Sequence, residues 1–349
     1  MLDVAIKGTL GETVFDMAFT ASDGVTAIFG PSGAGKTTVA NAIAGLWRPD
    51  KGRIALGDKV WFDSNAGIWV PPHKRKIGYV FQDARLFPHM SVAQNLRYGG
   101  SHDAARLIDL LDLAHLLTRR PSGLSGGEKQ RVAIARALMR NPDLIIMDEP
   151  MAALDGPRKA EVLPYLEHLR DMSAVPIIYV SHAMAEVSRL AASLVLVKDG
   201  NVAGFGPINE VLSNPDNAGM LAGRDLGAVI AARVDGHDHA TNITTLAFSG
   251  GALHLAGISG SIGQELRLRI PAQDVILSLN MPRGMSALNV LTVDITSVSA
   301  AGKGTALIGL QAGAASLLAQ ITEHSAKTMH LEAGQQVYAI VKATAVAPT

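Results

Sequence analysis

The chain has 349 residues, more than one ordinary domain needs and enough for two. It carries 31 basic and 31 acidic side chains, and this even balance argues against a nucleic-acid partner held by bulk electrostatics. It has no cysteine, which excludes disulfides, zinc–thiolate sites and cysteine nucleophiles. The first residues do not have the pattern of a signal peptide, and no apolar run approaches the roughly 20 residues of a membrane span, so we expect a cytoplasmic chain.

The first elements have the pattern of a parallel α/β fold. Apolar stretches at Leu2–Ile6 and Val14–Phe19 predict an opening β-hairpin or meander. The apolar run Val25–Phe29 ends in a glycine-rich turn, and Lys36–Leu46 then has helical spacing. The order strand, glycine loop, helix is the start of a parallel α/β unit.

More buried strands and a helical insertion follow. The short apolar runs Leu144–Met147, Pro176–Val180 and Leu194–Val197 are typical of strands that helices cover on both faces. Ala104–Leu117 carries leucines at helical spacing and predicts one amphipathic helix. The sequence therefore predicts a parallel sheet with a helical insertion ahead of its later strands.

The composition changes after about Gly223. The polar segment Asp235–His239 is interpreted as a linker turn, in which His237 and His239 are solvated side chains and not metal ligands. Beyond it, short alternating runs separated by Gly and Ser predict a small all-β barrel domain made of two related pieces. These runs are Leu266–Ile270, Val290–Ile295, Thr305–Leu310 and Val337–Val341, with Pro282–Gly284 between the two pieces.

The strongest motif is GPSGAGKT at Gly30–Thr37, which fits the phosphate-loop pattern G-x-x-x-x-G-K-[ST]. Its glycines let the backbone curl around an anion, and the following helix adds the positive end of its dipole. Lys36 then reaches the β- and γ-phosphates of a nucleotide, and the Thr37 hydroxyl holds Mg²⁺. The predicted ATP-binding residues of this loop are Gly30, Pro31, Ser32, Gly33, Ala34, Gly35, Lys36, Thr37 and Thr38.

A second motif supplies the metal and water chemistry. The strand Leu144–Met147 leads into Asp148 and Glu149, which places both at the carboxyl end of a parallel sheet, where ligands bind. Asp148 suits the Mg²⁺ shell, and Glu149 suits a general base that polarises the attacking water. Together with the phosphate loop, the motif predicts an ATPase that uses ATP and Mg²⁺.

A third motif narrows the class of ATPase. Leu124–Arg131 reads LSGGEKQR and precedes the helix-forming run Val132–Met139. It resembles the signature motif of the ABC ATPases, usually written LSGGQ, with Glu128 in place of the common Gln. The resemblance implies a homodimer in which the signature residues close over the γ-phosphate of ATP held by the opposite subunit. These residues are Ser125, Gly126 and Gly127.

Three more positions agree in order and spacing with this family. Gln82 matches the Q-loop glutamine, which the family uses toward Mg²⁺ and water and to sense the membrane partner. Asp155 matches the D-loop at the dimer interface, and His182 matches the switch histidine that donates toward the γ-phosphate. The resemblance implies the catalytic set Glu149, His182 and Gln82 and the metal set Thr37, Gln82 and Asp148. For the aromatic that stacks on adenine, the candidates are Phe15 and Phe19.

Further segments resemble one group of ABC importers. Tyr79–His89 and Ser91–Tyr98 look like the importer ATPases for molybdate. The C-terminal segment is similar to a small molybdate- and tungstate-binding barrel, although Leu288 stands where that barrel has an Arg. The candidates left for an oxyanion there are Ser286, Asn289 and Lys342, and the alternative is a barrel that only joins two subunits.

The resemblance covers the whole chain and implies an α/β fold class, a P-loop ABC ATPase domain with a mixed sheet, followed by a small all-β, OB-like barrel. The expected limits are 1–225 for the ATPase domain, with a helical subdomain at about 85–140. A linker and first β-segment are expected at 226–284, and a barrel of the MOP/TOBE type at 285–349.

As function, the resemblance implies a motor for molybdate or tungstate import. The homodimer is expected on the cytoplasmic face of the inner membrane, bound to permease subunits and served indirectly by a periplasmic or extracellular binding protein. The segment Phe87–Leu96 is expected to form the groove for the permease. One alternative is an importer of sulfate, sugar or polyamine. The other is an ABC ATPase acting on DNA or ribosomes, which a single cassette with a compact β tail disfavours.

Overall fold

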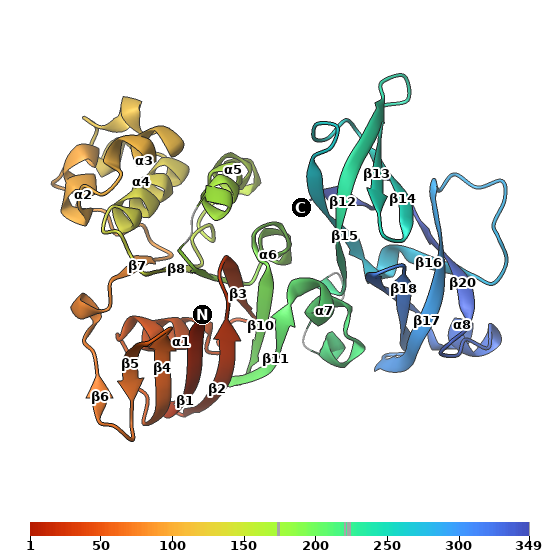
Figure 1. Cartoon of the computed structure of the whole chain (residues 1–349), viewed down its shortest axis with the longest axis horizontal. Helices are drawn as coiled ribbons and strands as arrows, with labels where there is room; N and C mark the ends of the chain where they lie inside the picture. The colour runs from red at the N-terminus through yellow and green to blue at the C-terminus, as the bar shows by residue number, and fades with distance from the viewer. Residues whose placement is uncertain (173–174, 220, 222–224, 349) are drawn as a thin grey trace. The chain divides into compact units, whose positions relative to one another are not determined.

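The chain folds into two compact units, Met1–Phe205 and Gly206–Thr349. The computed structural model describes residues 1–172, 175–219, 221 and 225–348, so Gly223 lies outside the described residues. Each unit has a hydrophobic core of its own. In Figure 1 the first unit runs from red to light green and the second from green to blue. No helix among the described residues is long and apolar enough to cross a membrane.

An eleven-stranded mixed sheet is the framework of the first unit. The predicted opening hairpin is present, since β1 and β2 pair antiparallel, whereas β3 pairs parallel with β9 and β10. The strands lie in the order β6-β5-β4-β1-β2-β11-β10-β3-β9-β8-β7. They are β1 (Leu2–Leu10), β2 (Thr13–Ala21), β3 (Val25–Phe29), β4 (Lys51–Leu56), β5 (Lys59–Asp63), β6 (Ile68–Trp69), β7 (Ile77–Val80), β8 (Leu144–Asp148), β9 (Ile177–Ser181), β10 (Ser193–Lys198) and β11 (Asn201–Pro207).

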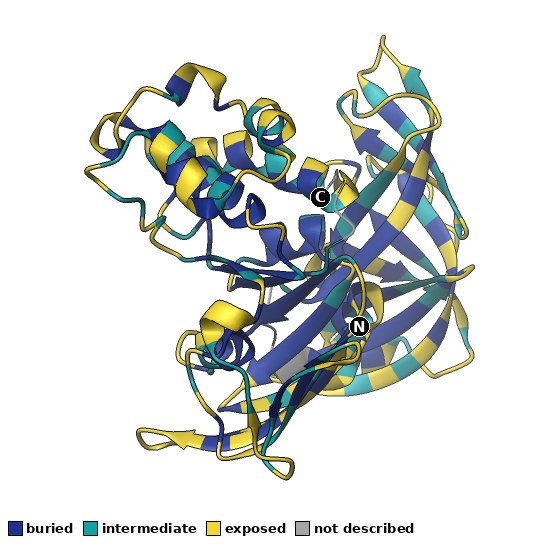
Figure 2. Cartoon of the chain, turned by 60° about the vertical axis from the view of Figure 1, so that its left-hand side comes forward, coloured by how far each residue is buried: buried dark blue, intermediate teal, exposed yellow. Residues whose placement is uncertain are grey.

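Helices cover the central strands of this sheet. Every residue of β3, β8 and β9 is buried, as the continuous apolar runs predict for strands covered on both faces, and Figure 2 shows them as dark blue arrows. Figure 1 shows α2, α3 and α4 gathered in a part of their own beyond β7. The helices are α1 (Lys36–Ala44), α2 (Val92–Gly99), α3 (Ala104–Leu110), α4 (Gly126–Leu138), α5 (Gly156–Met172) and α6 (Met184–Leu190), with short 3₁₀ turns at Pro72–Lys74, Ala114–Leu116 and Pro121–Gly123.

The prediction of one helix over Ala104–Leu117 was wrong. α3 ends at Leu110, and Asp112 has a φ of 49°, which no α-helix continues. The turn lets Leu111, Leu113 and Leu116 all reach the core, where each is fully buried. Burial of these leucines on a bent chain therefore overrides the helical spacing.

The fully buried Arg75 fixes α1 against the sheet. Its guanidinium donates hydrogen bonds to Ala42 O and Ile43 O in the last turn of α1, each over 2.8 Å. A cation suits this end of the helix because the carbonyls there carry the negative end of the dipole. Burial lowers the pKa of Arg75 to about 10, a value that leaves it charged at neutral pH. The opposite end of α1, which follows the phosphate loop, is thereby held in place.

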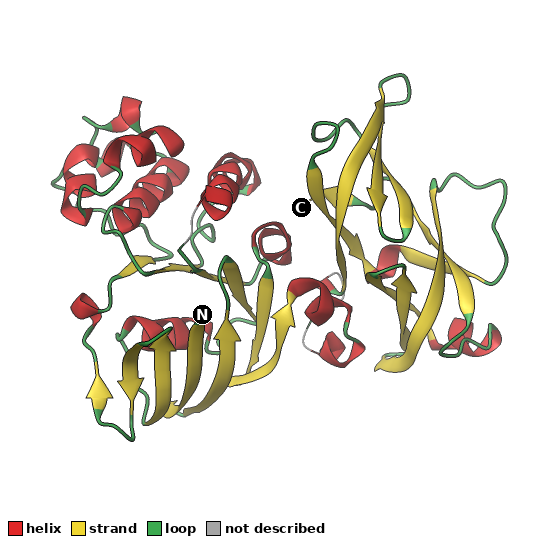
Figure 3. Ribbon diagram, viewed as in Figure 1, coloured by secondary structure: helices red, strands yellow, loops and turns green. Residues whose placement is uncertain are grey.

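Two five-stranded sheets make up the second unit and share one core. Figure 3 shows strands in most of this unit, which confirms the predicted all-β domain. The first sheet has the order β14-β13-β12-β15-β21, and the second β16-β20-β17-β18-β19. The strands are β12 (Gly227–Asp238), β13 (Ile243–Phe248), β14 (Gly251–Ala256), β15 (Glu265–Pro271), β16 (Val275–Ser278), β17 (Asn289–Gly302), β18 (Thr305–Ala312), β19 (Ala315–Thr322), β20 (Gln336–Val341) and β21 (Ala347–Pro348); the helices are α7 (Ile208–Ser213) and α8 (Glu323–Thr328), with 3₁₀ turns at Pro215–Gly219 and Ala272–Asp274.

Two parts of this unit differ from the sequence analysis. Residues 206–219 group with the second unit, ahead of the expected limit at residue 225, because α7 packs on β12 and β19. The segment Asp235–His239, interpreted as a linker turn, lies almost wholly in β12, which pairs with β13 from Arg233 to Asp238. His237 there shares a hydrogen bond of 3.1 Å with Thr244 Oγ1.

Candidate functional site

The predicted site residues converge at the carboxyl ends of three neighbouring parallel strands. Phe29 of β3 lies opposite Ser181 of β9, and Asp148 of β8 lies opposite Val180 of β9. Gly30, Glu149 and His182 each come directly after these paired strand ends, so the sheet brings all three to one edge. Ligands bind at this edge in open parallel sheets.

The phosphate loop has a shape that only glycine allows at two positions. A Cβ on Gly30 would lie 2.1 Å from Val197 O, and one on Gly35 would lie 2.5 Å from a ring carbon of Phe15. Gly35 also has a φ of 104° and is the N-cap of α1, with no side chain capping the helix. The first amides of α1 are therefore directed at the loop, where an anion finds both their N–H groups and the helix dipole.

Lys36 is buried inside the loop. Its ammonium donates to Gly30 O and Pro31 O, each over 2.9 Å, and lies 3.9 Å from Glu149 Oε1. Burial lowers the pKa of Lys36, while the negative charges of Glu149 and Asp148 oppose this shift. Phosphate oxygens would be better acceptors for the same three hydrogens, since charge-assisted hydrogen bonds are the stronger ones.

Thr37 and Asp148 bring a hydroxyl and a carboxylate together beside the phosphate loop. Thr37 Oγ1 donates to Asp148 Oδ1 over 3.0 Å, and Tyr79 Oη donates to Asp148 Oδ2 over 3.2 Å. Burial raises the pKa of Asp148, and these two hydrogen bonds act against it. Burial and the charge of Asp148 raise the pKa of Tyr79, which keeps its hydroxyl a donor.

A hydroxyl and a carboxylate are hard oxygen donors of the kind that Mg²⁺ prefers beside nucleotide phosphates. The residues present thus fit this ion. Among the described residues there is no cluster of three or more acidic, His or Cys side chains of the kind that holds a metal without a nucleotide.

Glu149 and His182 contact each other beside the loop. His182 Nδ1 lies 3.1 Å from Glu149 Oε1, and the Glu149 amide donates to Val180 O over 2.9 Å. Glu149 has a φ of 46°, a region that residues other than glycine rarely adopt and that functional sites often retain. Its side chain is 19% exposed and that of His182 is 52% exposed, so a water molecule can reach both.

A buried network behind His182 was missed by the sequence analysis. Glu186, in the first turn of α6, accepts hydrogen bonds from Tyr179 Oη and Ser181 Oγ, each over 2.9 Å. Lys159 of α5 donates to its other oxygen over 2.9 Å. Ser181 Oγ in turn accepts the Ala183 amide, so the backbone on both sides of His182 is held. A buried acid so close to the predicted histidine was visible in the sequence only as a polar residue on an apolar helix.

The signature residues begin α4. Ser125 caps the helix: its hydroxyl accepts the Glu128 amide, and the Glu128 carboxylate accepts the Ser125 amide over 2.6 Å. The Glu that replaces the usual Gln therefore completes a capping box. Burial opposes its ionisation, but the hydrogen bonds with Ser125 and the nearby Arg119 and Arg131 lower the pKa of Glu128 overall. Among the described residues, no hydrogen bond joins Ser125, Gly126 or Gly127 to the phosphate loop.

Asp155 and Gln82 lie on exposed segments next to these motifs. Asp155 precedes α5 and accepts the Arg158 amide over 3.1 Å. Leu154 before it packs on Gly126, where a Cβ would lie 2.9 Å from the leucine side chain. Gln82 lies two residues beyond Val80, which pairs with Met147, just as Glu149 lies two residues beyond Met147. Gln82 and Glu149 therefore belong to adjacent loops at the same edge.

The two adenine candidates are both core residues, so that expectation was wrong. Phe15 and Phe19 are each 3% exposed, and Phe15 packs edge to face with Trp47 at 5.5 Å. Because the sequence analysis considered only aromatic side chains, it did not include Leu10, an exposed apolar residue on the same hairpin. The pairing of Gly8 with Phe15 and of Leu10 with Thr13 places Leu10 on the face of the hairpin that carries Phe15 below Gly35. Leu10 is 50% exposed, so it offers an apolar surface there.

An aromatic groove lies between β7 and α4. Its cavity of about 410 Å³ is lined by aromatic side chains and three arginines. Of the predicted segment Phe87–Leu96, Phe87 lines this groove, whereas Leu96 is buried and Asn95 holds the loop through hydrogen bonds to Phe87. The side chains that line the groove are Ile77, Tyr79, Phe81, Arg85, Phe87, Tyr98, Arg136, Ala137 and Arg140.

The oxyanion candidates of the second unit do not converge on a common anion site. Asn289 is 1% exposed, and its amide is used by the backbone of His254: its oxygen accepts from His254 N over 2.6 Å and its nitrogen donates to His254 O over 3.0 Å. Asn289 therefore joins β17 to β14. Ser286 and Lys342 are both exposed.

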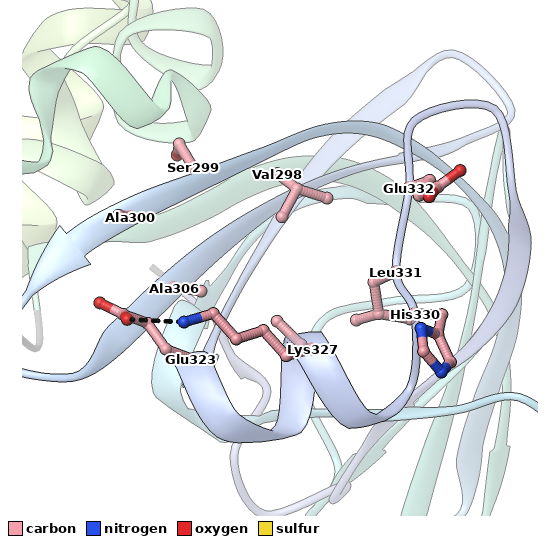
Figure 4. A pocket seen from close by; sticks show the side chains of 10 residues that line it. Val298, Ser299, Ala300, Ala306, Glu323, Lys327, His330, Leu331 and Glu332 are labelled. Carbon is pink, nitrogen blue, oxygen red and sulfur yellow. Dashed lines mark ion pairs between the residues drawn. The ribbon is translucent and has the colours of Figure 1, made fainter.

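A cavity of the second unit lies elsewhere. Figure 4 shows it between β17, β18 and α8, with a volume of about 500 Å³. Glu323 and Lys327 form an ion pair of 3.8 Å along its rim, and the floor is apolar. None of the three oxyanion candidates lines this cavity.

Comparisons with known proteins agree with the motifs. A family model described as ABC transporter matches residues 15–152, and one described as TOBE domain matches residues 285–348. The molybdenum import ATP-binding protein ModC of Mesorhizobium japonicum is 47% identical over 97% of this chain and 94% of its own. Among solved structures, cbiO1 of Clostridium perfringens, part of an ABC transporter complex, covers 62% of this chain and 92% of its own at 28% identity, with a TM-score of 0.54. A dimeric ATP-binding cassette bound to ADP and phosphate covers 60% of this chain and 99% of its own at 26% identity, with a TM-score of 0.50.

Proposed function

Because this chain belongs to the ABC transporter family and, within it, to the molybdenum import ATP-binding proteins, we propose that it hydrolyses ATP to drive molybdate import through separate membrane subunits. The observation that carries the proposal is the convergence of Lys36, Asp148, Glu149 and His182 at one edge of the parallel sheet. Identity over nearly the whole chain supports the cargo.

Each residue at this edge has a distinct task in the proposed reaction. The amides of the phosphate loop and Lys36 bind the β- and γ-phosphates. Thr37, Asp148 and Gln82 would hold Mg²⁺, which neutralises charge on the phosphates when bound. Glu149 accepts a hydrogen bond from the attacking water, and His182 donates toward the γ-phosphate. The His182–Glu149 contact orients both groups before nucleotide arrives.

The signature residues act on the nucleotide of the second subunit. Within one chain, Ser125, Gly126 and Gly127 make no described contact with the phosphate loop, so they are free for a phosphate held elsewhere. The packing of Leu154 on Gly126 links the signature to Asp155, which faces the partner at the same interface. The similar solved cassette that is dimeric with ADP and phosphate supports this arrangement.

The adenine ring packs on Leu10 in this proposal. Leu10 is exposed at the tip of the hairpin, on the face that carries Phe15 below the phosphate loop. An aliphatic side chain supplies apolar contact area without ring stacking, and the binding energy then comes mainly from the phosphates.

The aromatic groove receives the membrane subunit on the cytoplasmic face of the membrane. Its walls carry the rings of Phe87 and Tyr98, whose centroids are 4.6 Å apart, and the cations Arg136 and Arg140. Arg136 already donates to Ala84 O and Arg85 O. Arg140 is exposed at the rim, so a helix with an apolar face and a carboxylate fits this groove.

Reconstitution of the complete transporter tests the cargo. The chain, its membrane subunits and its binding protein are placed in vesicles, and ATP hydrolysis is measured with molybdate, tungstate, sulfate and maltose. We expect molybdate or tungstate to raise hydrolysis several-fold over the level without solute. Stimulation by sulfate or a sugar alone would assign the chain to another importer.

A further inference from the structure

Tyr79 contacts both the carboxylate assigned to Mg²⁺ and the wall of the aromatic groove. Its hydroxyl lies 3.2 Å from Asp148 Oδ2 and 3.1 Å from Asn41 Oδ1. A phenol has one hydrogen to donate, so the carboxylate and the amide oxygen compete for it. The motifs gave Tyr79 no role at the nucleotide site, because its position in β7 resembles that of any half-buried strand residue.

The Asp148 carboxylate is held from two sides. Thr37 donates to Oδ1 from the start of α1, and Tyr79 donates to Oδ2 from β7. Mutation of a residue that orients a metal ligand in this way typically lowers metal affinity or activity about 10- to 100-fold. The position of the Asp148 oxygens therefore depends on where the Tyr79 ring lies.

The ring of Tyr79 belongs to the groove. It stacks on Phe81, with centroids 4.2 Å apart and an angle of 27° between the planes. The Arg85 guanidinium lies 3.9 Å from the centre of the Phe81 ring. All three side chains line the cavity of about 410 Å³, and Phe81 directly precedes Gln82. A group that occupies the cavity therefore has the stacked pair as part of its wall.

We propose that Tyr79 is a positioning residue that orients Asp148 for Mg²⁺ and transmits occupancy of the groove to that carboxylate. The inference rests on the proposed ATPase function and deepens it. The occupant is a short helix of the membrane subunit, whose apolar face packs on Phe81 and whose carboxylate pairs with Arg140. The Tyr79 hydroxyl can donate to Asp148 or to Asn41, and such a helix favours the ring position that donates to Asp148. The helix can shift the balance between these two positions only by the difference in its contacts with them.

The first experiment measures Mg²⁺ affinity without turnover. Tyr79→Phe keeps the stacked ring and removes the hydroxyl. We expect Mg²⁺ binding to the ADP-loaded full chain, followed by calorimetry, to weaken about tenfold. Tyr338→Phe is the matched control, because it removes a tyrosine hydroxyl from β20 of the second unit, which takes no part in the nucleotide site. The control is expected to keep the wild-type Mg²⁺ affinity. An unchanged affinity in Tyr79→Phe, or an equal loss in both variants, overturns the positioning role.

The second experiment measures coupling in the assembled transporter at saturating Mg²⁺. We expect the stimulation of ATP hydrolysis by the loaded binding protein to fall at least threefold in Tyr79→Phe and to be unchanged in Tyr338→Phe. If ATP hydrolysis by Tyr79→Phe is stimulated as fully as that of wild type, Tyr79 does not transmit occupancy of the groove to Asp148. A failure of the proposed ATPase function is distinguishable, because then wild-type chain hydrolyses no ATP, while the calorimetric comparison still reports on Tyr79.

Discussion

Two regions of this chain carry polar residues of the types that bind anions, the phosphate loop of the first unit and the oxyanion candidates of the second. The fold uses the two sets differently. In the first unit, the phosphate loop keeps its amides and the Lys36 ammonium directed at one spot beside Asp148 and Glu149. In the second unit, the amide of Asn289 is occupied by the backbone of His254. The comparison teaches that the type of a polar side chain does not by itself make it a ligand, because the fold can bind both of its polar atoms to a neighbouring strand, as it does for Asn289.

The largest effect is expected at Glu149. Glu149→Gln removes the base but keeps the size of the side chain, so hydrolysis should fall about 100- to 1000-fold. ATP binding should persist, and gel filtration with ATP and Mg²⁺ should show a stable dimer. Glu167→Gln is the control, because Glu167 pairs with Arg189 on α6, away from the loop. Near wild-type turnover in Glu149→Gln would remove this residue from the reaction.

The second region is tested by Asn289→Leu. The change removes both hydrogen bonds to the partly buried N–H and C=O of His254 in β14, so we expect a loss of about 2 kcal/mol in the unfolding free energy of the second unit. ATP hydrolysis of the folded protein should be unchanged. Ser286→Ala, three residues earlier and exposed, is the control and should change neither quantity. An Asn289→Leu protein that is as stable as wild type but no longer binds molybdate would show that Asn289 is a ligand and not a link between β17 and β14.

A smaller effect is expected at the signature serine. Ser125→Ala and Ser91→Ala each break a capping box, and each should lower stability by about 1 kcal/mol. Only Ser125→Ala also removes a donor to the partner's ATP, so its turnover should fall about tenfold below that of Ser91→Ala. Equal turnover of the two variants at equal folded fraction would show that Ser125 acts only as a helix cap.

The smallest expected effect concerns adenine. Leu10→Ala removes apolar contact area, and the dissociation constant of ATP should rise roughly threefold, measured by titration of a fluorescent ATP analogue. Val14→Ala is the control, because Val14 is also an exposed apolar residue but lies on the other face of the hairpin. The same change in both variants would assign adenine to another part of the chain.

The sequence predicted those parts of the site that depend on local pattern. Gly30–Thr37, Asp148–Glu149 and Ser125–Gly127 are contiguous motifs whose roles follow from the backbone that they impose. Contacts between distant segments were missed, such as Tyr79 on Asp148 and Lys159 on Glu186, because no spacing in the sequence records them. Leu10, which we propose as the contact for adenine, was missed because an exposed leucine has no distinctive pattern.

The fold shows the same difference between features set by local pattern and features set by contacts between distant segments. Continuous apolar runs predicted the buried strands β3, β8 and β9, whereas the helix over Ala104–Leu117 was broken by tertiary burial of its leucines. The second unit also shows why its limits were hard to place. Strands before and after Gly284 share one core, so a chain cut there would lose the partner strand of β16.

The central claim is that each ATP is bound between two copies of this chain. The most direct measurement is a structure of Glu149→Gln with ATP and Mg²⁺. The account predicts a dimer in which Lys36 contacts the γ-phosphate and the hydroxyl of the partner's Ser125 lies about 3 Å from the same phosphate. A nucleotide-loaded structure with every Ser125 distant from any triphosphate would contradict it.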